Sequence, residues 1–139
     1  MMERHYILRT QRIGLRTWLD DDAEAFCELN ADAEVMRYFP ATLSNEESLN
    51  LFHRIRNVAT TQGYGIYAAD ELETGACIGY VGFSSPKFET WFTPCIEILW
   101  RLQRKAWGKG YATESAMAAI NYGFDIKNIN RIIGCAMKE

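Results

Sequence analysis

The sequence predicts one α/β domain, residues 1–139, in which helices flank a mixed, mainly antiparallel, twisted sheet. Strand-like and helix-like segments follow one another as one strand, two helices, three strands, a helix and a last strand. A turn signal between the second and third strands indicates an antiparallel hairpin. The strand–helix–strand order near the end of the chain indicates a crossover connection. The last helix carries small residues along one side, so it can lie close to a sheet.

The first strand and the first helix are predicted from short patterns. Apolar residues alternate with polar or small ones over residues 12–17, as in a half-buried strand. Three aspartates at 20–22 are expected to cap a helix that extends to about residue 30. One face of that helix is expected to carry Ala23, Phe26, Cys27 and Asn30.

A second helix is expected from a capping box. Ser44 is followed three residues later by Glu47, so each side chain can bond the other residue's backbone N–H. The helix should extend to about residue 61. Its apolar stripe is expected to consist of Leu49, Phe52, Ile55 and Ala59.

The second half of the sequence predicts the rest of the sheet. Strand-like runs occupy residues 64–69 and 76–85, with a hairpin turn at 70–75. Pro86 and Pro94 bracket an exposed loop before a strand over 95–102. The helix after Gly110 has a small-residue side, and a last strand is expected over 131–137. That side consists of Ala112, Ala116, Ala119 and Gly123.

Composition excludes several classes of protein. A net charge of −3 gives no reason to expect nucleic acid, and no run approaches the roughly 20 apolar residues of a membrane span. Four cysteines without a C-x-x-C pair suit reduced thiols in a cytoplasmic protein. The two histidines, His5 and His53, have no partners at metal-ligand spacing, so we expect no metal.

The most informative segment joins the strand over 95–102 to the helix after it. A basic loop with Arg104, Lys105 and Lys109 leads through Trp107 to two glycines, Gly108 and Gly110. Glycine permits positive φ and close approach of a ligand to the backbone. A helix N-terminus presents unpaired N–H groups, which favour an anion. The segment therefore predicts a phosphate-binding loop.

Two known phosphate motifs do not fit this loop. The P-loop pattern requires Gly where position 103 is Gln and Ser or Thr where position 110 is Gly. The dinucleotide-binding pattern requires a third Gly where position 113 is Thr. The loop instead resembles motif A of the GNAT superfamily of acyl-CoA-dependent N-acyltransferases, in which Gln or Arg precedes Gly-x-Gly by three positions. Lys105 occupies that first position here and keeps the positive charge.

The resemblance extends to the whole chain. Trp107 and residues 111–114 are similar to the branch with the RimJ/RimL ribosomal-protein and spermidine acetyltransferases. Residues 7–16 are similar to the opening strand of that branch, and residues 122–124 and 130–132 to its third helix and following strand. The resemblance implies the GNAT-like acyl-CoA N-acyltransferase fold.

The same resemblance implies elements beyond the end of this sequence. Related chains continue with an Asn-x-x-Ser helix and a final hairpin, so we expect the C-terminal elements to be missing. The missing part would often supply the general acid. Without these elements the last strand would have an uncovered edge. We therefore expect that the chain is a fragment of a longer protein, or that it forms a homodimer across that edge.

The resemblance implies acetyl-CoA as co-substrate and a direct attack by a primary amine in a ternary complex. Residues 100–102 would run beside the pantetheine arm and offer an N–H to the thioester oxygen. The glycine loop would hold the pyrophosphate. The expected cofactor-binding residues are Trp100, Arg101, Leu102, Lys105, Trp107, Gly108, Lys109, Gly110, Tyr111, Ala112 and Thr113.

Glu97 is the candidate catalytic residue. It is a carboxylate among apolar strand residues close to the cofactor loop, a setting that favours accepting a proton, directly or through water. The alternative is an ion-paired residue that only orients the strand. Tyr38 and Phe39 are expected to line the acceptor cleft, because this region borders the cleft in the family; a packed loop is the alternative.

Two functional classes remain open from the sequence. The first is an acetyltransferase that acts on a protein N-terminus or a small-molecule amine, such as a polyamine, an amino acid or an antibiotic. The second is a non-catalytic acyl-CoA-binding module or truncated regulatory copy. The glycine loop and Glu97 favour the first class, and the expected lack of C-terminal elements favours the second.

Overall fold

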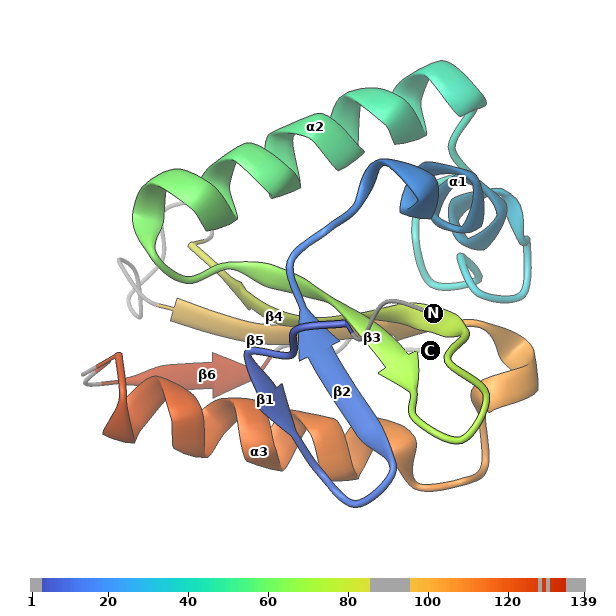
Figure 1. Ribbon diagram of the computed structural model, residues 1–139. Coiled ribbons are helices and arrows are strands. Elements are labelled where there is room, and N and C mark those ends of the chain that lie inside the picture. Colours follow the sequence, from blue (N-terminus) through green and yellow to red (C-terminus); the bar gives the residue numbers. More distant parts are fainter. Residues whose placement is uncertain (1–3, 86–95, 128, 130, 135–139) are drawn as a thin grey trace.

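The computed structural model describes residues 4–85, 96–127, 129 and 131–134, and within them one sheet has the order β1-β2-β3-β4-β5-β6. Neighbouring strands are antiparallel except β5 and β6, which are parallel. Helices α1 and α2 cover one face of the sheet and α3 the other (Figure 1). The predicted mixed α/β class is confirmed. The strands are β1 (Leu8–Arg9), β2 (Ile13–Arg16), β3 (Ile66–Glu71), β4 (Cys77–Ser84), β5 (Ile96–Leu102) and β6 (Ile132–Gly134).

The chain begins with a hairpin where the sequence suggested one opening strand. The backbone N–H of Thr10 donates to the carbonyl of Ile13 (2.8 Å), which turns the chain between β1 and β2. The expected half-buried pattern over 12–17 is wrong for β2, whose residues are all buried. Tyr6 packs over Gly14, and Arg16, two residues later on the same face of the strand, is buried in ion pairs.

A buried ion-pair network ties three elements together. Arg16, 2% exposed, donates to the carboxylates of Asp22 and Asp70 over 2.7–3.0 Å, and Arg4 and Tyr6 also donate to Asp70. Burial alone would raise the pKa of Asp70, but the hydrogen bonds from Arg16 and Arg4 outweigh it, so this pKa lies below its usual value. The network fixes β2, β3 and the start of the first helical layer.

Helix α1 (Ala23–Ala31) begins one residue after the aspartates that were expected to cap it. Asp20–Asp22 form a short 3-10 turn, η1, and the side chain of Asp22 caps no helical N–H. Its carboxylate accepts instead from the Leu19 N–H and from Arg16. An ion pair with a buried arginine therefore takes the place of the expected cap.

Helix α2 (Asn45–Gln62) has the predicted capping box. The Glu47 N–H donates to the Ser44 hydroxyl, and the Ser44 N–H donates to the Glu47 carboxylate. The predicted stripe is correct for Phe52 and Ile55 but wrong for Leu49, which is 38% exposed. Ser48 is buried in its place, because the buried face follows a four-residue step from Phe52.

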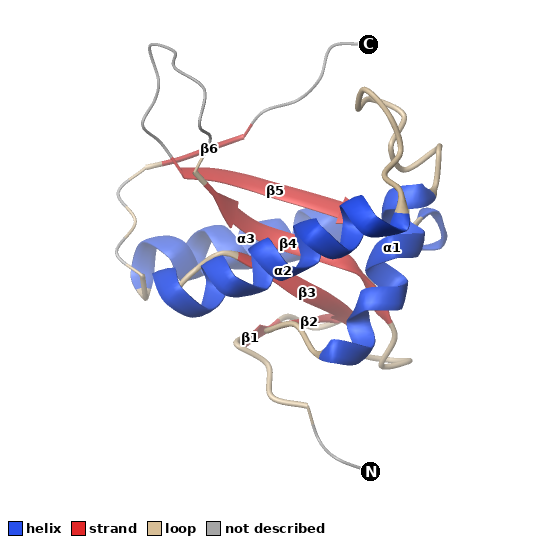
Figure 2. Ribbon diagram, turned by 90° about the horizontal axis from the view of Figure 1, so that it is seen from above, coloured by secondary structure: helices blue, strands red, loops and turns tan. Residues whose placement is uncertain are grey.

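The end of β5 is held in place by the central hairpin and by the crossover connection. Strands β3 and β4 pair as predicted, although Asp70 and Glu71, expected in the turn, belong to β3. Strand β5, helix α3 (Tyr111–Asp125) and β6 form the crossover, with β6 and β1 at opposite edges of the sheet (Figure 2). The last strand, predicted over 131–137, is seen as β6, and its part over 135–137 lies outside the described residues, as does the proline-bracketed loop.

Helix α3 lies close to the sheet, as its small residues predicted. Ala116 and Ala119 are buried against a cluster that includes Phe83 and Ile98. At Gly123, an added Cβ would lie 3.0 Å from the Phe83 ring. This close contact holds the C-terminal part of α3 against the sheet.

Candidate functional site

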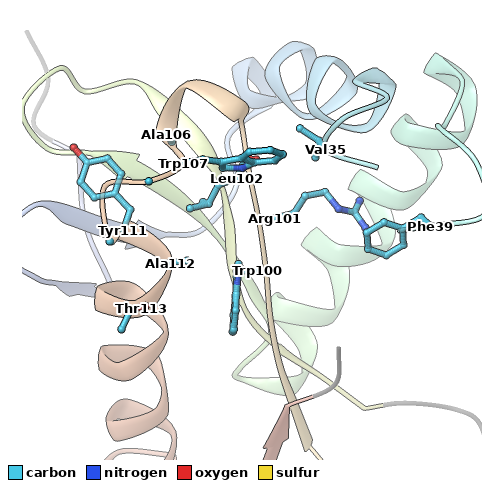
Figure 3. Close-up of a pocket in the computed structure, with 12 residues that line it drawn as sticks. Val35, Phe39, Trp100, Arg101, Leu102, Ala106, Trp107, Tyr111, Ala112 and Thr113 are labelled. Atoms are coloured by element: carbon cyan, nitrogen blue, oxygen red, sulfur yellow. The ribbon is translucent and has the colours of Figure 1, made fainter. Parts of the chain in front are cut away.

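A pocket of about 420 Å³ lies where β5 ends and α3 begins. Figure 3 shows side chains from β5, from the glycine loop and from the α1–α2 connection around it. It is lined by Val35, Phe39, Trp100, Arg101, Leu102, Ala106, Trp107, Gly108, Gly110, Tyr111, Ala112 and Thr113.

The glycine loop leaves a row of backbone donors open at this pocket. Gly108 and Gly110 have φ of 74° and 80°, which glycine adopts without strain. Gly110 is the N-cap of α3 and has no side chain with which to cap the helix. The first helical bond runs from the Glu114 N–H to the Gly110 carbonyl (3.0 Å), so the three N–H groups before it have no helical acceptor. Such groups attract an anion.

Side chains distant in sequence hold the loop. Arg12 donates to the carbonyl of Lys109 (2.7 Å) and pairs with Glu114 (2.8 Å), and its guanidinium lies 4.6 Å from the Tyr111 ring centroid. On the other side, the Trp107 indole N–H donates to the Leu102 carbonyl (2.8 Å). Ion pairing and hydrogen bonding therefore fix the loop before any ligand binds.

Glu114 is the carboxylate at the centre of this support. It accepts from the Arg12 side chain and backbone and from the Thr10 hydroxyl. Burial alone would raise the pKa of Glu114, but these hydrogen bonds outweigh it and lower the pKa. The groups that Glu114 binds belong to the turn between β1 and β2.

The outer edge of β5 is open next to the loop. Among the described residues, β6 pairs only with Ile96–Ile98, so the last part of β5 has β4 alone as a strand partner. The N–H of Gln103 donates to Ile78 of β4 (2.8 Å). Because bonding alternates along an antiparallel pair, Trp100 and Leu102 direct their backbone groups away from β4. The Leu102 carbonyl already accepts from Trp107, so this edge offers the Leu102 N–H and both backbone groups of Trp100 to an extended ligand.

Nine of the eleven predicted cofactor-binding residues line the pocket: Trp100, Arg101, Leu102, Trp107, Gly108, Gly110, Tyr111, Ala112 and Thr113. Lys105 lies instead beside a neighbouring cavity of about 400 Å³ that Arg104 and Asp32 also line. The Lys109 ammonium lies 5.8 Å from the Tyr111 ring centroid. Both lysines are exposed near the loop, where they add positive charge without lining the pocket.

The predicted acceptor and catalytic residues are not all brought together. Phe39 lines the pocket, whereas Tyr38 does not. The Cζ of Arg37 lies 5.3 Å from the ring centroid of Tyr38. Glu97 is partly buried in β5, opposite Ser84 of β4 and Ile133 of β6, and does not line the pocket. The catalytic role of Glu97 therefore stays a prediction.

Sequence reasoning missed three residues at this site. Val35 and Ala106 line the pocket, and Arg12 holds the loop. Val35 precedes the predicted acceptor residues by only three positions, so a wider window would have included it. Arg12 is separated from Lys109 by 97 residues, and no local pattern indicates that contact.

Within the part of the chain that the structure describes, no group of three His, Cys, Asp or Glu side chains is arranged to hold a metal ion. None of the helices described there combines the length and the apolar character needed to cross a bilayer.

Comparison with known proteins gives consistent matches. Residues 12–139 match the family model described as acetyltransferase (GNAT) domain. The chain is 31% identical over 127 residues to a Bacillus licheniformis protein named uncharacterized N-acetyltransferase p20, which covers 90% of this chain and 70% of that protein. An acetyltransferase from Agrobacterium tumefaciens strain C58 superposes with a TM-score of 0.77 at 27% identity, covering 95% of this chain and 77% of that one. A spermidine N-acetyltransferase from Vibrio cholerae, solved with CoA and spermine, shares the fold, with a TM-score of 0.69 at 18% identity and coverage of 90% and 71%.

Proposed function

Because this chain belongs to the GNAT acetyltransferase domain family, we propose that it transfers an acetyl group from acetyl-CoA to a primary amine by direct attack in a ternary complex. The family makes it an acetyl-CoA-dependent N-acetyltransferase. The observation that carries the proposed reaction is the row of open N–H groups at the start of α3, next to the open edge of β5.

The two halves of this arrangement suit the two halves of the cofactor. The N–H groups from Gly108 to Thr113 would bind the pyrophosphate, with Lys105 and Lys109 adding positive charge. The open edge of β5 over Trp100 to Leu102 would hydrogen-bond the amide groups of the pantetheine arm. An extended arm paired along β5 brings the thioester toward the side of the pocket that Phe39 lines.

The reaction then needs an oxyanion donor and a proton acceptor. The amine nitrogen forms a bond to the thioester carbon, the carbon–sulfur bond breaks, and coenzyme A leaves as the thiol or thiolate. A backbone N–H at the end of β5 would stabilise the oxyanion. Glu97 would accept the proton of the attacking amine through water, since its side chain lies outside the pocket lining.

The acceptor is proposed to be a protein N-terminal amine or a small-molecule amine, which would enter beside Tyr38 and Phe39. We place the reaction in the cytoplasm, because Cys27 and Cys77 are free thiols and the four cysteines show no paired spacing. Residues 1–139 would act as one domain, and a homodimer is a further prediction that size-exclusion chromatography tests.

Two assays test the proposed function. Calorimetry with acetyl-CoA measures binding, and thiol release over an amine panel measures transfer. The variant Glu97→Gln should keep acetyl-CoA affinity and lose turnover, most strongly at low pH where the amine is protonated, because the amide accepts no proton. Binding without thiol release on any amine would contradict the transfer. An unchanged pH–rate profile in Glu97→Gln would remove Glu97 from the mechanism.

A further inference from the structure

The pocket contains one charged side chain, at its end nearest to the α1–α2 connection. Arg101 is the only charged residue among the described residues that line it, and Val35 and Phe39 lie at the same end. Figure 3 shows the guanidinium of Arg101 extended from β5 against the ring of Phe39. No Asp or Glu is among the described residues that line the pocket, so this end of it is electropositive.

Arg101 has no carboxylate partner within the described part of the chain. Five other arginines each pair with an Asp or Glu there. The Nη1 of Arg101 donates to the neutral Oδ1 of Asn30 (2.6 Å), while its Nε–H is buried and meets no acceptor in the part of the chain that the structure describes. The Nδ2 of Asn30, which is fully buried, also has no acceptor among the described residues. Buried donors nearly always have acceptors, so this corner holds a surplus of donors.

Two aromatic rings fix the plane of this guanidinium. The Cζ of Arg101 lies 4.4 Å from the ring centroid of Phe39 and 5.3 Å from that of Tyr80. Tyr80 is buried on the sheet, and Phe39 is 44% exposed. A guanidinium with a fixed plane presents its donors as a planar fork, which matches a carboxylate better than a point charge does.

We propose, building on the acetyl transfer above, that Arg101 selects acceptors that carry a carboxylate close to the amine, as an α-amino acid does. A carboxylate supplies the negative charge that this corner lacks and accepts from the guanidinium nitrogens of Arg101 that are not buried, whereas the Nε–H of Arg101 and the Nδ2 of Asn30 stay out of its reach. A polyamine would bring positive charge against the unpaired guanidinium, which disfavours it. The acceptor class is therefore an amino acid rather than a polyamine.

The first test needs only the unmodified chain. Thiol release is measured for alanine, phenylalanine and glutamate, for their α-amides, and for spermine. We expect kcat/KM to be at least about tenfold higher for an acid than for its amide, the size of a charge-assisted hydrogen bond. The amides have the more readily deprotonated amines, so amine basicity cannot produce this preference. A preference for spermine or for the amides overturns the proposal.

A binding measurement separates this proposal from the transfer chemistry. The N-acetylated acids and N-acetylated amides are titrated by calorimetry into the chain saturated with coenzyme A, which requires no turnover. The acids should bind at least about tenfold more tightly. Equal affinity, or no detectable binding of any acid, overturns the carboxylate site even if amines are acetylated. Tight binding of the acids without any turnover supports this site and contradicts the proposed function alone.

Substitution then assigns the preference to Arg101. Arg101→Met should reduce the ratio of acid to amide to near one, and Arg101→Lys should restore part of it, because charge returns without the fork. Arg37→Met is the matched control, since it removes an exposed arginine that also lies over a ring of the same connection. An unchanged ratio in Arg101→Met, or an equal fall in Arg37→Met, overturns the assignment.

Discussion

Replacing Gly108 by alanine should weaken acetyl-CoA binding far more than it destabilises the fold. Gly108 has φ of 74°, and no atom lies within 4 Å of an added Cβ, so the methyl group meets no protein. Left-handed backbone costs an alanine about 1–2 kcal/mol, partly offset by about 0.4–1 kcal/mol from a stiffer unfolded chain. The net loss of about 1 kcal/mol corresponds to roughly 3–5 °C in Tm.

The effect on binding has a different origin. A chain that relieves the strain at Gly108 by rotating toward negative φ turns neighbouring N–H groups away from the pocket. Losing one N–H bond to a charged phosphate costs about 1.5–3 kcal/mol, which is roughly ten- to hundredfold in Kd. Calorimetry with acetyl-CoA measures this change, and a thermal melt shows that the variant is folded.

Gly63→Ala is the matched control for this prediction. Gly63 follows α2 with φ of 83° and also has nothing within 4 Å of an added Cβ. It should therefore show the same loss in Tm and an unchanged Kd for acetyl-CoA. If both variants bind acetyl-CoA as tightly as the unmodified chain, the glycine loop does not hold the diphosphate and the assignment of the site fails.

Four further predictions concern the frame around the site. Asp70→Asn breaks one of the two ion pairs of the buried Arg16 and should cost about 3–5 kcal/mol by chemical denaturation. Asp20→Asn, in an exposed ion pair, should change stability little. Folding lowers the pKa of Asp70, so its contribution to the free energy of unfolding is complete above its unfolded pKa of about 4. That contribution is lost as the pH falls through the folded pKa. Acid titration of the unmodified chain, followed by circular dichroism, measures this loss. Glu114→Gln should raise KM for acetyl-CoA several-fold with little change in kcat, because the loop loses its support; an unaltered KM would contradict that role. Gly79→Ala and Gly82→Ala should both lower Tm, since an added Cβ would lie 2.0 Å from a β5 carbonyl or 2.2 Å from the carbonyl of Gly65, but only Gly79→Ala should also weaken acetyl-CoA binding.

Local signals predicted the parts of the fold and site that depend on neighbours in sequence. The Ser44 capping box and the glycine loop each lie within a few residues, and both could be read from residue type and spacing. Leu49 was misplaced because two adjacent residues of a helix differ by about 100° in direction, and the sheet determines which of them is buried.

Contacts distant in sequence were not predictable in this way. The alternation over residues 12–17 predicts that Arg16 lies on the polar face of a half-buried strand. Its pairing with Asp70, 54 positions later, explains why it is buried instead. Likewise, nothing near Arg12 indicates that it supports the glycine loop. Such pairs depend on which strands become neighbours, and a single sequence does not display that arrangement.

Side chains along β5 point alternately to the two faces of the sheet, and this alternation separates acceptor binding from cofactor binding. Ile98 and Leu102 belong to the cluster beneath α3, and Leu99 to the cluster beneath α1 and α2, so alternate side chains face opposite layers. Arg101 therefore faces the α1–α2 connection and the proposed acceptor, while the backbone on either side of it faces the open edge and the proposed cofactor. A side-chain change at Arg101 should consequently alter acceptor choice, and a backbone displacement at the same position should alter cofactor affinity. One strand can thus be tested for both roles independently, because its side chains and its main chain point in different directions.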